Sequence, residues 1–400
     1  MRDFSDAKES TMRLRMLQAA LYLLGICGVA HGVLAATAPI IPPPPSIAAS
    51  GYLLMDADTN KVLVENNIHE PLPPASLTKI MTSYIAAVEL AAGRIKEDDQ
   101  VLISVKAWQT PGSRMFIREG TRVSVGDLLR GIIIQSGNDA SVALAEHIAG
   151  SEDAFANMMN QQSAELGMGS TQFINATGLP DKGHYTSAWD LALLTRSLIN
   201  RFPEVYALYA ERAFTFNDIP QPNRNRLLWR DKTVDGVKTG HTRAAGYCLV
   251  ASAKRDNMRL VSVVMGTESD EVRMRESQKL LSYGFRYFET RKLYEARVPL
   301  KTAELWYGEA ENIELGVLED VYITIPRGHY NDVEAELKIA KVIEAPARAG
   351  QEFGELRLLL GDELTYSAPL VALADAEEAG VFSRMGDFIY LFFGSLFSSD

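Results

Sequence analysis

Ser76 and Lys79, three residues apart, form a pair that could carry out nucleophilic catalysis. The stretch from 76 to about 92 is apolar on all sides and stops at Gly93, which predicts a buried helix. Residues three apart share one face of a helix, so the Lys79 amine can lie against the Ser76 hydroxyl. A serine hydroxyl is a weak nucleophile until a base takes its proton, and lysine can be that base when burial lowers its pKa. Because the pattern is common, it identifies no function by itself.

Two further polar motifs follow along the chain. Ser136-Gly137-Asn138 falls in a break between a predicted helix at 124–134, which begins with a Ser-x-x-Asp capping pattern, and a helix that runs to Gly150. A hydroxyl and an amide on such a loop could relay a proton and hold a substrate amide. Taken alone, this motif is equally typical of a plain turn between helices.

Lys238-Thr239-Gly240 opens an extended segment. The lysine adds positive charge, the threonine hydroxyl can bind a carboxylate, and the glycine lets a substrate backbone approach closely. Without the other two motifs it would indicate an ordinary start of a strand.

The elements that must position these motifs predict one α/β domain. Residues 51–56 and 61–65 flank a turn rich in Asp and Asn and predict a β-hairpin. Two β-rich runs at 246–254 and 258–266 enclose a tight turn, and a long helix is expected at 270–290. Strands at both ends with helices between them predict a sheet that pairs distant segments. From about 298, short runs with partial alternation at 313–318, 321–325, 333–343 and 356–360 predict a small all-β domain.

The three motifs, in this order, are the signature of penicillin-binding proteins and class A β-lactamases. The chain resembles low-molecular-mass penicillin-binding proteins of the D-alanyl-D-alanine carboxypeptidase type. The resemblance runs from Ala48 to the C-terminal helix, and its strongest stretches are residues 74–82, 135–140, 175–179 and 234–242. It implies a penicilloyl-serine transferase (β-lactamase-like) α/β catalytic domain, a small all-β C-terminal domain and an amphipathic anchor helix.

The resemblance also implies roles for particular residues. Ser76 would attack the carbonyl between the two terminal D-alanines of the peptidoglycan stem peptide, and Lys79 would take its proton. Ser136 and Lys238 would help to pass that proton to the leaving D-alanine. The backbone N–H groups of Ser76 and His241 would stabilise the oxyanion.

The remaining implied residues bind the substrate. Asn138 would hold the amide on the acyl side, and Thr239, with Gly240 beside it, would bind near the terminal carboxylate. Arg224, in Asn223-Arg224-Asn225, is the expected arginine partner of that carboxylate, although its spacing to Lys238 is one residue short and Arg226 and Arg230 lie close by.

The N-terminus predicts export. Arg13 and Arg15 precede an apolar run to about residue 30 and then small residues, which is the order of a secretory signal peptide. The expected segments are a signal peptide at 1–35, a proline-rich linker at 36–47, a catalytic domain at 48–297, a β-rich domain at 298–375 and an anchor helix at 376–400. An uncleaved N-terminal membrane anchor is the alternative to the signal peptide.

The last twenty residues place apolar side chains at three- and four-residue spacing. This pattern favours a helix lying in a membrane interface, because the stretch is too short to span a bilayer. The alternative is a terminal helix docked on the protein's own core. Together these features predict a peripheral protein on the periplasmic face of the bacterial inner membrane.

Bulk composition restricts the partners. The formal net charge of −11 argues against nucleic acid as a partner. The histidines show no metal-ligand spacing, so neither a metal nor a cofactor is expected. Cys27 lies in the expected signal peptide, and Cys248 in an apolar strand is interpreted as a small core residue. The four tryptophans are expected to be packing residues; they are Trp108, Trp189, Trp229 and Trp306.

The main hypothesis is a serine-type D-Ala-D-Ala carboxypeptidase that forms a Ser76 acyl-enzyme during peptidoglycan maturation and binds β-lactams covalently. A D,D-endopeptidase that cuts cross-links is the principal alternative. A serine β-lactamase is less favoured, because no glutamate element for rapid deacylation is evident. A non-catalytic wall-binding protein is also less favoured, because all three motifs are intact.

Overall fold

The computed structural model of the protein describes residues 41–380. The predicted signal peptide lies outside the described residues, and so do the first part of the linker and all but the start of the predicted C-terminal helix. Within the described part, no helix is both long and apolar enough to cross a membrane.

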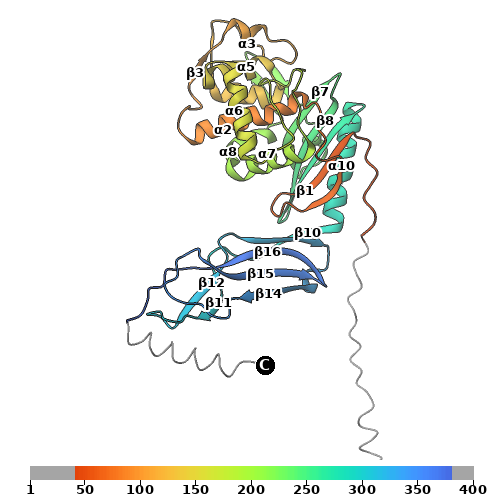
Figure 1. Ribbon diagram of the computed structural model, residues 1–400. Helices are drawn as coiled ribbons and strands as arrows, with labels where there is room; N and C mark the ends of the chain where they lie inside the picture. The colour runs from red at the N-terminus through yellow and green to blue at the C-terminus, as the bar shows by residue number, and fades with distance from the viewer. Residues whose placement is uncertain (1–40, 381–400) are drawn as a thin grey trace, which may run out of the picture. The chain divides into compact units, whose positions relative to one another are not determined.

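A five-stranded antiparallel sheet, with strand order β2-β1-β9-β8-β7, organises the first region (Figure 1). β1 (Gly51–Asp56) pairs with β2 (Val62–Asn66) as the predicted hairpin, and Asp56 Oδ1 accepts hydrogen bonds from the Asp58 and Thr59 N–H groups in its turn. β1 also pairs with β9 (Met258–Thr267), about two hundred residues later in the chain. β8 (Gly246–Arg255) and β7 (Val234–Thr242) complete the sheet. The predicted pairing of distant segments is therefore confirmed.

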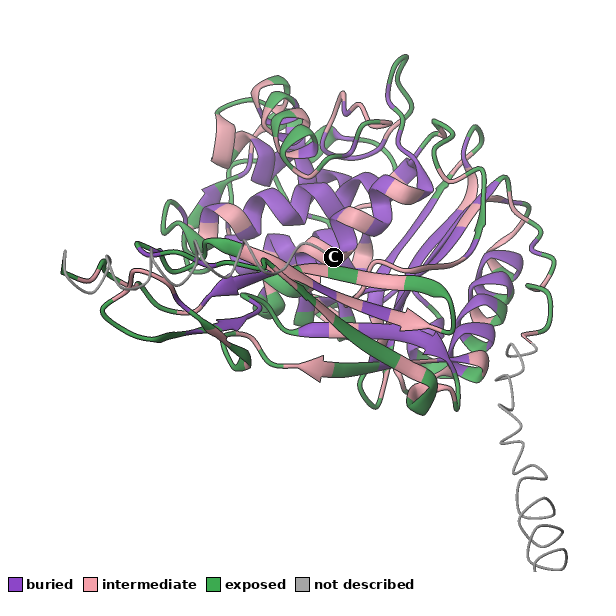
Figure 2. Cartoon of the chain, turned by 60° about the horizontal axis from the view of Figure 1, so that its bottom comes forward, coloured by how far each residue is buried: buried purple, intermediate pink, exposed green. Residues whose placement is uncertain are grey.

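Successive side chains of a strand point to opposite faces, so each face of the sheet packs into a different hydrophobic core. Leu53 and Val250 belong to the core that the helices between β2 and β7 cover. Leu54 and Leu249 belong to the core beneath α10 (Asp270–Tyr287). Figure 2 shows the buried residues concentrated in these helices and strands, with the exposed residues on loops and outer helical turns.

The helical part of this region is built from short elements. They are η1 (Ala75–Thr78), α2 (Lys79–Ala91), α3 (Val105–Gln109), α4 (Val125–Arg130), the π-turn η2 (Gly131–Gln135), α5 (Asn138–Ala149), α6 (Glu152–Glu165), α7 (Ala188–Arg201), α8 (Pro203–Ala207), η3 (Leu208–Ala210) and α9 (Leu227–Arg230). Two small antiparallel pairs accompany them: β3 (Gln100–Leu102) with β4 (Arg122–Ser124), which α3 separates in the chain, and the hairpin of β5 (Ala213–Phe216) with β6 (Ile219–Pro222). Ser124 caps α4 as predicted, because its side chain accepts from the Asp127 N–H.

The second region is all-β. One sheet has the order β11-β12-β16-β15-β14. Its strands are β11 (Pro299–Glu304), β12 (Asn312–Gly316), β14 (Val333–Ile339), β15 (Glu352–Leu360) and β16 (Glu363–Ala372), with the short helix η4 (Tyr330–Asp332) before β14. A separate pair joins β10 (Phe288–Tyr294) to β13 (Val321–Pro326).

Two boundaries predicted from the sequence differ from those in the structure. The helix expected to reach 290 ends at Tyr287, and the β-rich region begins with β10 at Phe288 rather than near 298. The reason is local, because Phe288 and Thr290 are buried at two-residue spacing, which suits a strand and not a helix.

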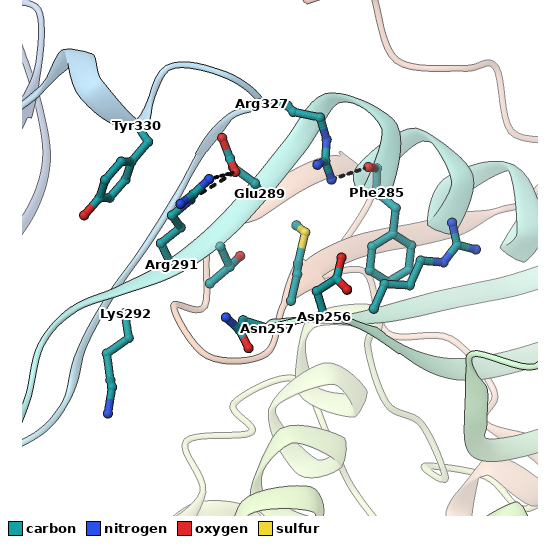
Figure 3. Close-up of a pocket in the computed structure, with 11 residues that line it drawn as sticks. Asp256, Asn257, Phe285, Glu289, Arg291, Lys292, Arg327 and Tyr330 are labelled. Atoms are coloured by element: carbon teal, nitrogen blue, oxygen red, sulfur yellow. Dashed lines mark hydrogen bonds and ion pairs between the residues drawn. The ribbon is translucent and has the colours of Figure 1, made fainter.

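A hydroxyl cluster links the two regions. Thr290 Oγ1 donates to Asp56 Oδ2 at 2.6 Å, and Thr59 and Thr324 hydroxyls lie 2.7 Å apart. A hollow beside this cluster is lined by charged residues that already have partners, among them Arg291 with Glu289 at 3.0 Å and Arg327 with the Phe285 carbonyl at 2.8 Å (Figure 3). The hollow shares no residue with the three polar motifs, and the Arg327 contact joins the β-rich region to α10.

Candidate active site

Ser76 lies on η1, one turn before Lys79 opens α2. The structure corrects the expected single α-helix here, because the nucleophile candidate stands on a 3-10 turn. Ala75 adopts a left-handed φ of 49°. The Ala75 carbonyl is pressed against Gly178, where an added Cβ would fall 1.8 Å from the Ala75 oxygen. The loop that contains Gly178 therefore fixes the path of η1, and only glycine fits at that contact.

Lys79 is fully buried and is held by three acceptors. Its Nζ donates to Ser76 Oγ at 3.1 Å, to Asn138 Oδ1 at 2.7 Å and to the Thr177 carbonyl at 2.5 Å. The structure thus brings together the first and second motifs, which are about sixty residues apart in the chain. The amine is aimed at the serine oxygen from which it would take a proton.

The electrostatic setting suits a lysine base. Burial, followed by the positive charge of Arg224, lowers the pKa of Lys79 to about 7, against a smaller opposing effect of Asp139. A lysine with this pKa is substantially neutral near physiological pH and can accept a proton.

Ser136 sits between the π-turn η2 and α5 with a left-handed φ of 65°. Its Oγ is buried and has no hydrogen-bond partner among the described residues. An unsatisfied buried hydroxyl is costly, and at a π-turn it is typical of a functional site. Ser136 therefore has a free hydroxyl available for a substrate or a travelling proton.

Asn138 opens α5 and is bonded on both sides of its amide. Besides accepting from Lys79, it donates through Nδ2 to the Pro111 carbonyl at 2.6 Å. The next residue, Asp139, accepts from the Met115 and Phe116 N–H groups at 2.9 Å each, which holds the neighbouring loop. Because an amide nitrogen carries two hydrogens, one Nδ2 hydrogen remains for a substrate amide.

The third motif lies against the first. An added Cβ at Gly240 would lie 3.0 Å from the Pro74 oxygen and 3.3 Å from Ala75 Cβ, so β7 passes directly beside η1. Lys238 is buried, with Nζ donating to the Thr239 carbonyl at 3.1 Å. Burial, and then the charge of Lys79, lower the pKa of Lys238 well below its ordinary value. The His241 ring stacks on Tyr247 with centroids 4.0 Å apart.

Arg224 follows β6 and reaches the second motif, where its Nε donates to the Gln135 carbonyl at 3.0 Å. Its buried neighbours Asn223 and Asn225 fix the segment, since Asn223 donates to the Glu211 carbonyl and Asn225 to the Gly236 carbonyl. Arg224 lies near the site despite its short spacing to Lys238 in sequence, and its positive charge lowers the pKa of both Lys79 and Lys238.

Sequence reasoning missed two residues of this site. Arg273, in the first turn of α10, donates to the Gly240 carbonyl at 2.9 Å and lowers the pKa of Lys238 by its charge. Thr177 lies in the stretch 175–179 that carries the resemblance, but no role was predicted for it. Its carbonyl accepts a hydrogen bond from Lys79. No sequence pattern marks either residue, because each reaches the site through contacts with residues that are far away in the chain.

Two other expectations have different outcomes. Cys248 is fully buried, and burial raises the pKa of its thiol to about 11, as a core residue requires. The packing role expected for all four tryptophans is wrong for Trp229, which is 47% exposed, and Trp108 is 37% exposed.

Residues 38–269 match the family described as D-alanyl-D-alanine carboxypeptidase. The chain belongs to this family. Residues 288–378 match the family described as penicillin-binding protein 5, C-terminal domain, and they begin where β10 begins.

Similar proteins support the assignment over most of the chain. D-alanyl-D-alanine carboxypeptidase DacC of Escherichia coli (strain K12) is 44% identical over 366 residues, which cover 88% of this chain and 92% of that protein. The structure of penicillin binding protein 5 from Haemophilus influenzae is similar with a TM-score of 0.82 at 44% identity, covering 84% of this chain and 100% of that one. Penicillin-binding protein D2 from Listeria monocytogenes in its ampicillin-bound form is similar with a TM-score of 0.57 at 28% identity, covering 61% and 100%.

The predicted family, the α/β catalytic fold with an all-β C-terminal domain, and the serine-type carboxypeptidase activity are therefore confirmed. Of the anchor helix predicted at 376–400, residues 381–400 lie outside the described residues. The predicted start at 376 is wrong, because 376–380 is not helical and Ala376 and Glu378 form β-bridges with Ala347 and Gly308.

Proposed function

We propose that Ser76 is the nucleophile and Lys79 the base of this carboxypeptidase. The observation that carries the proposal is the 3.1 Å contact between Lys79 Nζ and Ser76 Oγ, at a lysine whose pKa lies near 7. Ser76 Oγ forms a bond to the carbonyl carbon of the penultimate D-alanine while Lys79 takes the hydroxyl proton. The carbon–nitrogen bond then breaks, and the leaving amine receives a proton. Water subsequently hydrolyses the ester and restores Ser76.

The other motif residues have supporting roles in this proposal. Ser136, with its free buried hydroxyl, and Lys238 pass the proton to the leaving amine. The backbone N–H groups of Ser76 and His241 bind the oxyanion. Thr239 and Arg224 bind the terminal carboxylate beside Gly240, where the strand lies close to η1. Asn138 orients Lys79 and offers its second amide hydrogen to the acyl side.

A β-lactam is expected to react with Ser76 as the peptide does and then to persist. Its carboxylate would take the place of the terminal carboxylate, and no glutamate element for rapid deacylation, as in class A β-lactamases, is evident in the sequence. The ampicillin-bound relative is consistent with this expectation. Brief exposure to benzylpenicillin should give one adduct per chain by intact mass spectrometry, located on the peptide that contains Ser76.

The time course of the same experiment separates the candidate functions. An adduct that remains for many minutes after removal of the drug fits a carboxypeptidase. Rapid hydrolysis of benzylpenicillin without accumulation of adduct would instead favour a β-lactamase. No adduct and no release of D-alanine from a D-Ala–D-Ala peptide would favour a non-catalytic wall-binding protein.

We propose further that the chain is exported, acts on peptidoglycan in the periplasm, and binds the membrane surface through its C-terminal segment. The catalytic region would run from about 48 to 287, and the β-rich region from 288 to about 375. The support for anchoring is the sequence pattern alone, in which apolar residues of the last twenty recur at helical spacing.

Deleting residues 381–400 is expected to move the protein from the membrane fraction to the soluble fraction. Activity on a soluble peptide should change less than about two-fold, because none of the motif residues lies in this segment. Fractionation followed by an assay of D-alanine release measures both effects. As a matched pair, Phe388 and Phe392 can be replaced with serine on the apolar side, and Ser395 and Ser398 with alanine on the polar side. Only the first change should release the protein, whereas a truncated chain that fails to fold would support the docked-helix alternative.

A further inference from the structure

A groove of about 660 Å³, which we call the arginine groove, opens beside the proposed carboxylate site. The residues that matter for its chemistry are Arg224, Arg226, Trp229, Arg230, Asp270 and Arg273. Four of these six side chains are positively charged at neutral pH, and one is negatively charged. The chain as a whole carries a net charge of −11, so a local excess of positive charge stands out from the rest of the surface.

The arginine groove is continuous with the active site through two of its arginines. Arg224 donates to the Gln135 carbonyl, directly before Ser136. Arg273 donates to the Gly240 carbonyl of the third motif. The groove therefore begins where the proposed roles place the terminal carboxylate, which belongs to the leaving amino acid.

The positive charge of the arginine groove is only partly neutralised within the protein. Asp270 forms ion pairs with Arg273 and, at 3.4 Å, with Arg226. Among the described residues, no carboxylate pairs with Arg224 or Arg230. Burial, and then the positive charge of Arg273, lower the pKa of Arg224.

One carboxylate on the substrate does not account for the whole arginine groove. The terminal carboxylate needs Arg224 and Thr239, and the methyl side chain of D-alanine has no group that could use Arg226 or Arg230. Trp229 lies between these two arginines in sequence and exposes 47% of its surface. An exposed tryptophan offers an apolar face to the aliphatic part of a longer side chain.

We propose that the arginine groove is a subsite for a second carboxylate on the leaving group. The proposal rests on the proposed function and extends it from D-alanine to leaving groups that carry an acidic side chain. The α-carboxylate of the leaving residue binds Thr239 and Arg224, its aliphatic carbons contact Trp229, and its second carboxylate binds Arg230 and Arg226. That second carboxylate can belong to a single acidic D-amino acid or to a longer peptide joined through its amine, as in a cross-linked dimer.

The test compares three synthetic peptides with the same acyl part and a final D-Ala, D-Glu or D-Gln. D-Glu and D-Gln have nearly the same shape and differ by one charge, so their ratio of kcat/KM isolates the second carboxylate. We expect a D-Glu/D-Gln ratio of about 5 at low salt, which corresponds to a solvent-exposed ion pair. The ratio should fall as salt is added, because exposed pairs are screened.

Variants locate the effect in the arginine groove. Arg230→Gln, and the double variant Arg226→Gln with Arg230→Gln, should bring the D-Glu/D-Gln ratio to about 1 while kcat/KM for the D-Ala peptide changes less than about two-fold. Arg118→Gln is the matched control, because Arg118 is an exposed arginine that does not line the groove. It should leave the ratio unchanged.

The outcomes keep the two proposals apart. A wild-type ratio of 1 or below, or a ratio that survives in the double variant, overturns the acidic subsite while the D-Ala peptide still reports the carboxypeptidase. Loss of activity on all three peptides would instead count against the proposed catalytic residues. Repeating the comparison with a cross-linked dimer distinguishes the two sources. Sensitivity to Arg230→Gln with both the dimer and the D-Glu peptide assigns the subsite to cross-linked peptides as well, and sensitivity with the D-Glu peptide alone assigns it to single acidic residues.

Discussion

Replacing Ser76 with alanine is expected to lower kcat/KM for D-alanine release by on the order of 10⁶-fold, to the background rate. The hydroxyl is the only group that Lys79 Nζ contacts on η1, and without it no acyl-enzyme can form. The fold should be retained, because Ser76 is half-buried and its removal leaves no large cavity. Covalent labelling by benzylpenicillin should be lost together with activity.

The control for this variant is Ser50→Ala, which removes a hydroxyl near the start of β1 that makes one long bond of 3.4 Å to the Gly266 carbonyl. It should keep wild-type activity and labelling. A Ser76→Ala protein that still released D-alanine at a substantial fraction of the wild-type rate would show that another residue is the nucleophile.

Lys79 should control the pH dependence of acylation. Replacing it with alanine removes the proposed base and is expected to lower kcat/KM by about 10³-fold at pH 8. In the wild-type enzyme, Lys79 accepts a proton only when it is neutral, so kcat/KM should rise with pH and level off above the lysine pKa of about 7. Each pH unit below that value should cost about ten-fold in kcat/KM. A pH profile of acylation, followed with a chromogenic β-lactam, measures this rise of kcat/KM with pH, which is the acidic limb of the profile.

The position of the limb can be moved without touching Lys79. The charge of Arg224 helps to lower the pKa of Lys79, so Arg224→Gln should raise that pKa and shift the limb to higher pH. Arg118→Gln should leave it in place. The position of the limb is the informative quantity, because Arg224→Gln is also expected to weaken binding of the substrate carboxylate. If the limb keeps its position in the residual activity of Lys79→Ala, the titrating group is a different residue.

Local pattern was sufficient for much of the architecture. The hairpin of β1 and β2, the capped start of α4, the break at Ser136 and the strands β8 and β9 all follow from periodicity, turn residues and caps within about ten residues. These signals depend on near neighbours in the chain, and tertiary packing did not override them here. The switch from α10 to β10 was misplaced because the helical and strand patterns overlap over 288–290.

The sequence by itself determined which residues could carry the chemistry: the serine and lysine one turn apart, the second serine in its helix break, and the lysine of the third motif, which the structure places in the middle of β7 rather than at the start of a strand. The tertiary structure alone decided what makes them competent. Burial brings the pKa of Lys79 to about 7, Thr177 and Asn138 aim its amine at Ser76, and Gly178 sets the turn on which Ser76 stands. The tertiary structure also places Arg224, Arg230 and Arg273 around one groove. Desolvation and contacts between segments a hundred residues apart are properties of the packed chain, and no short window of sequence contains them.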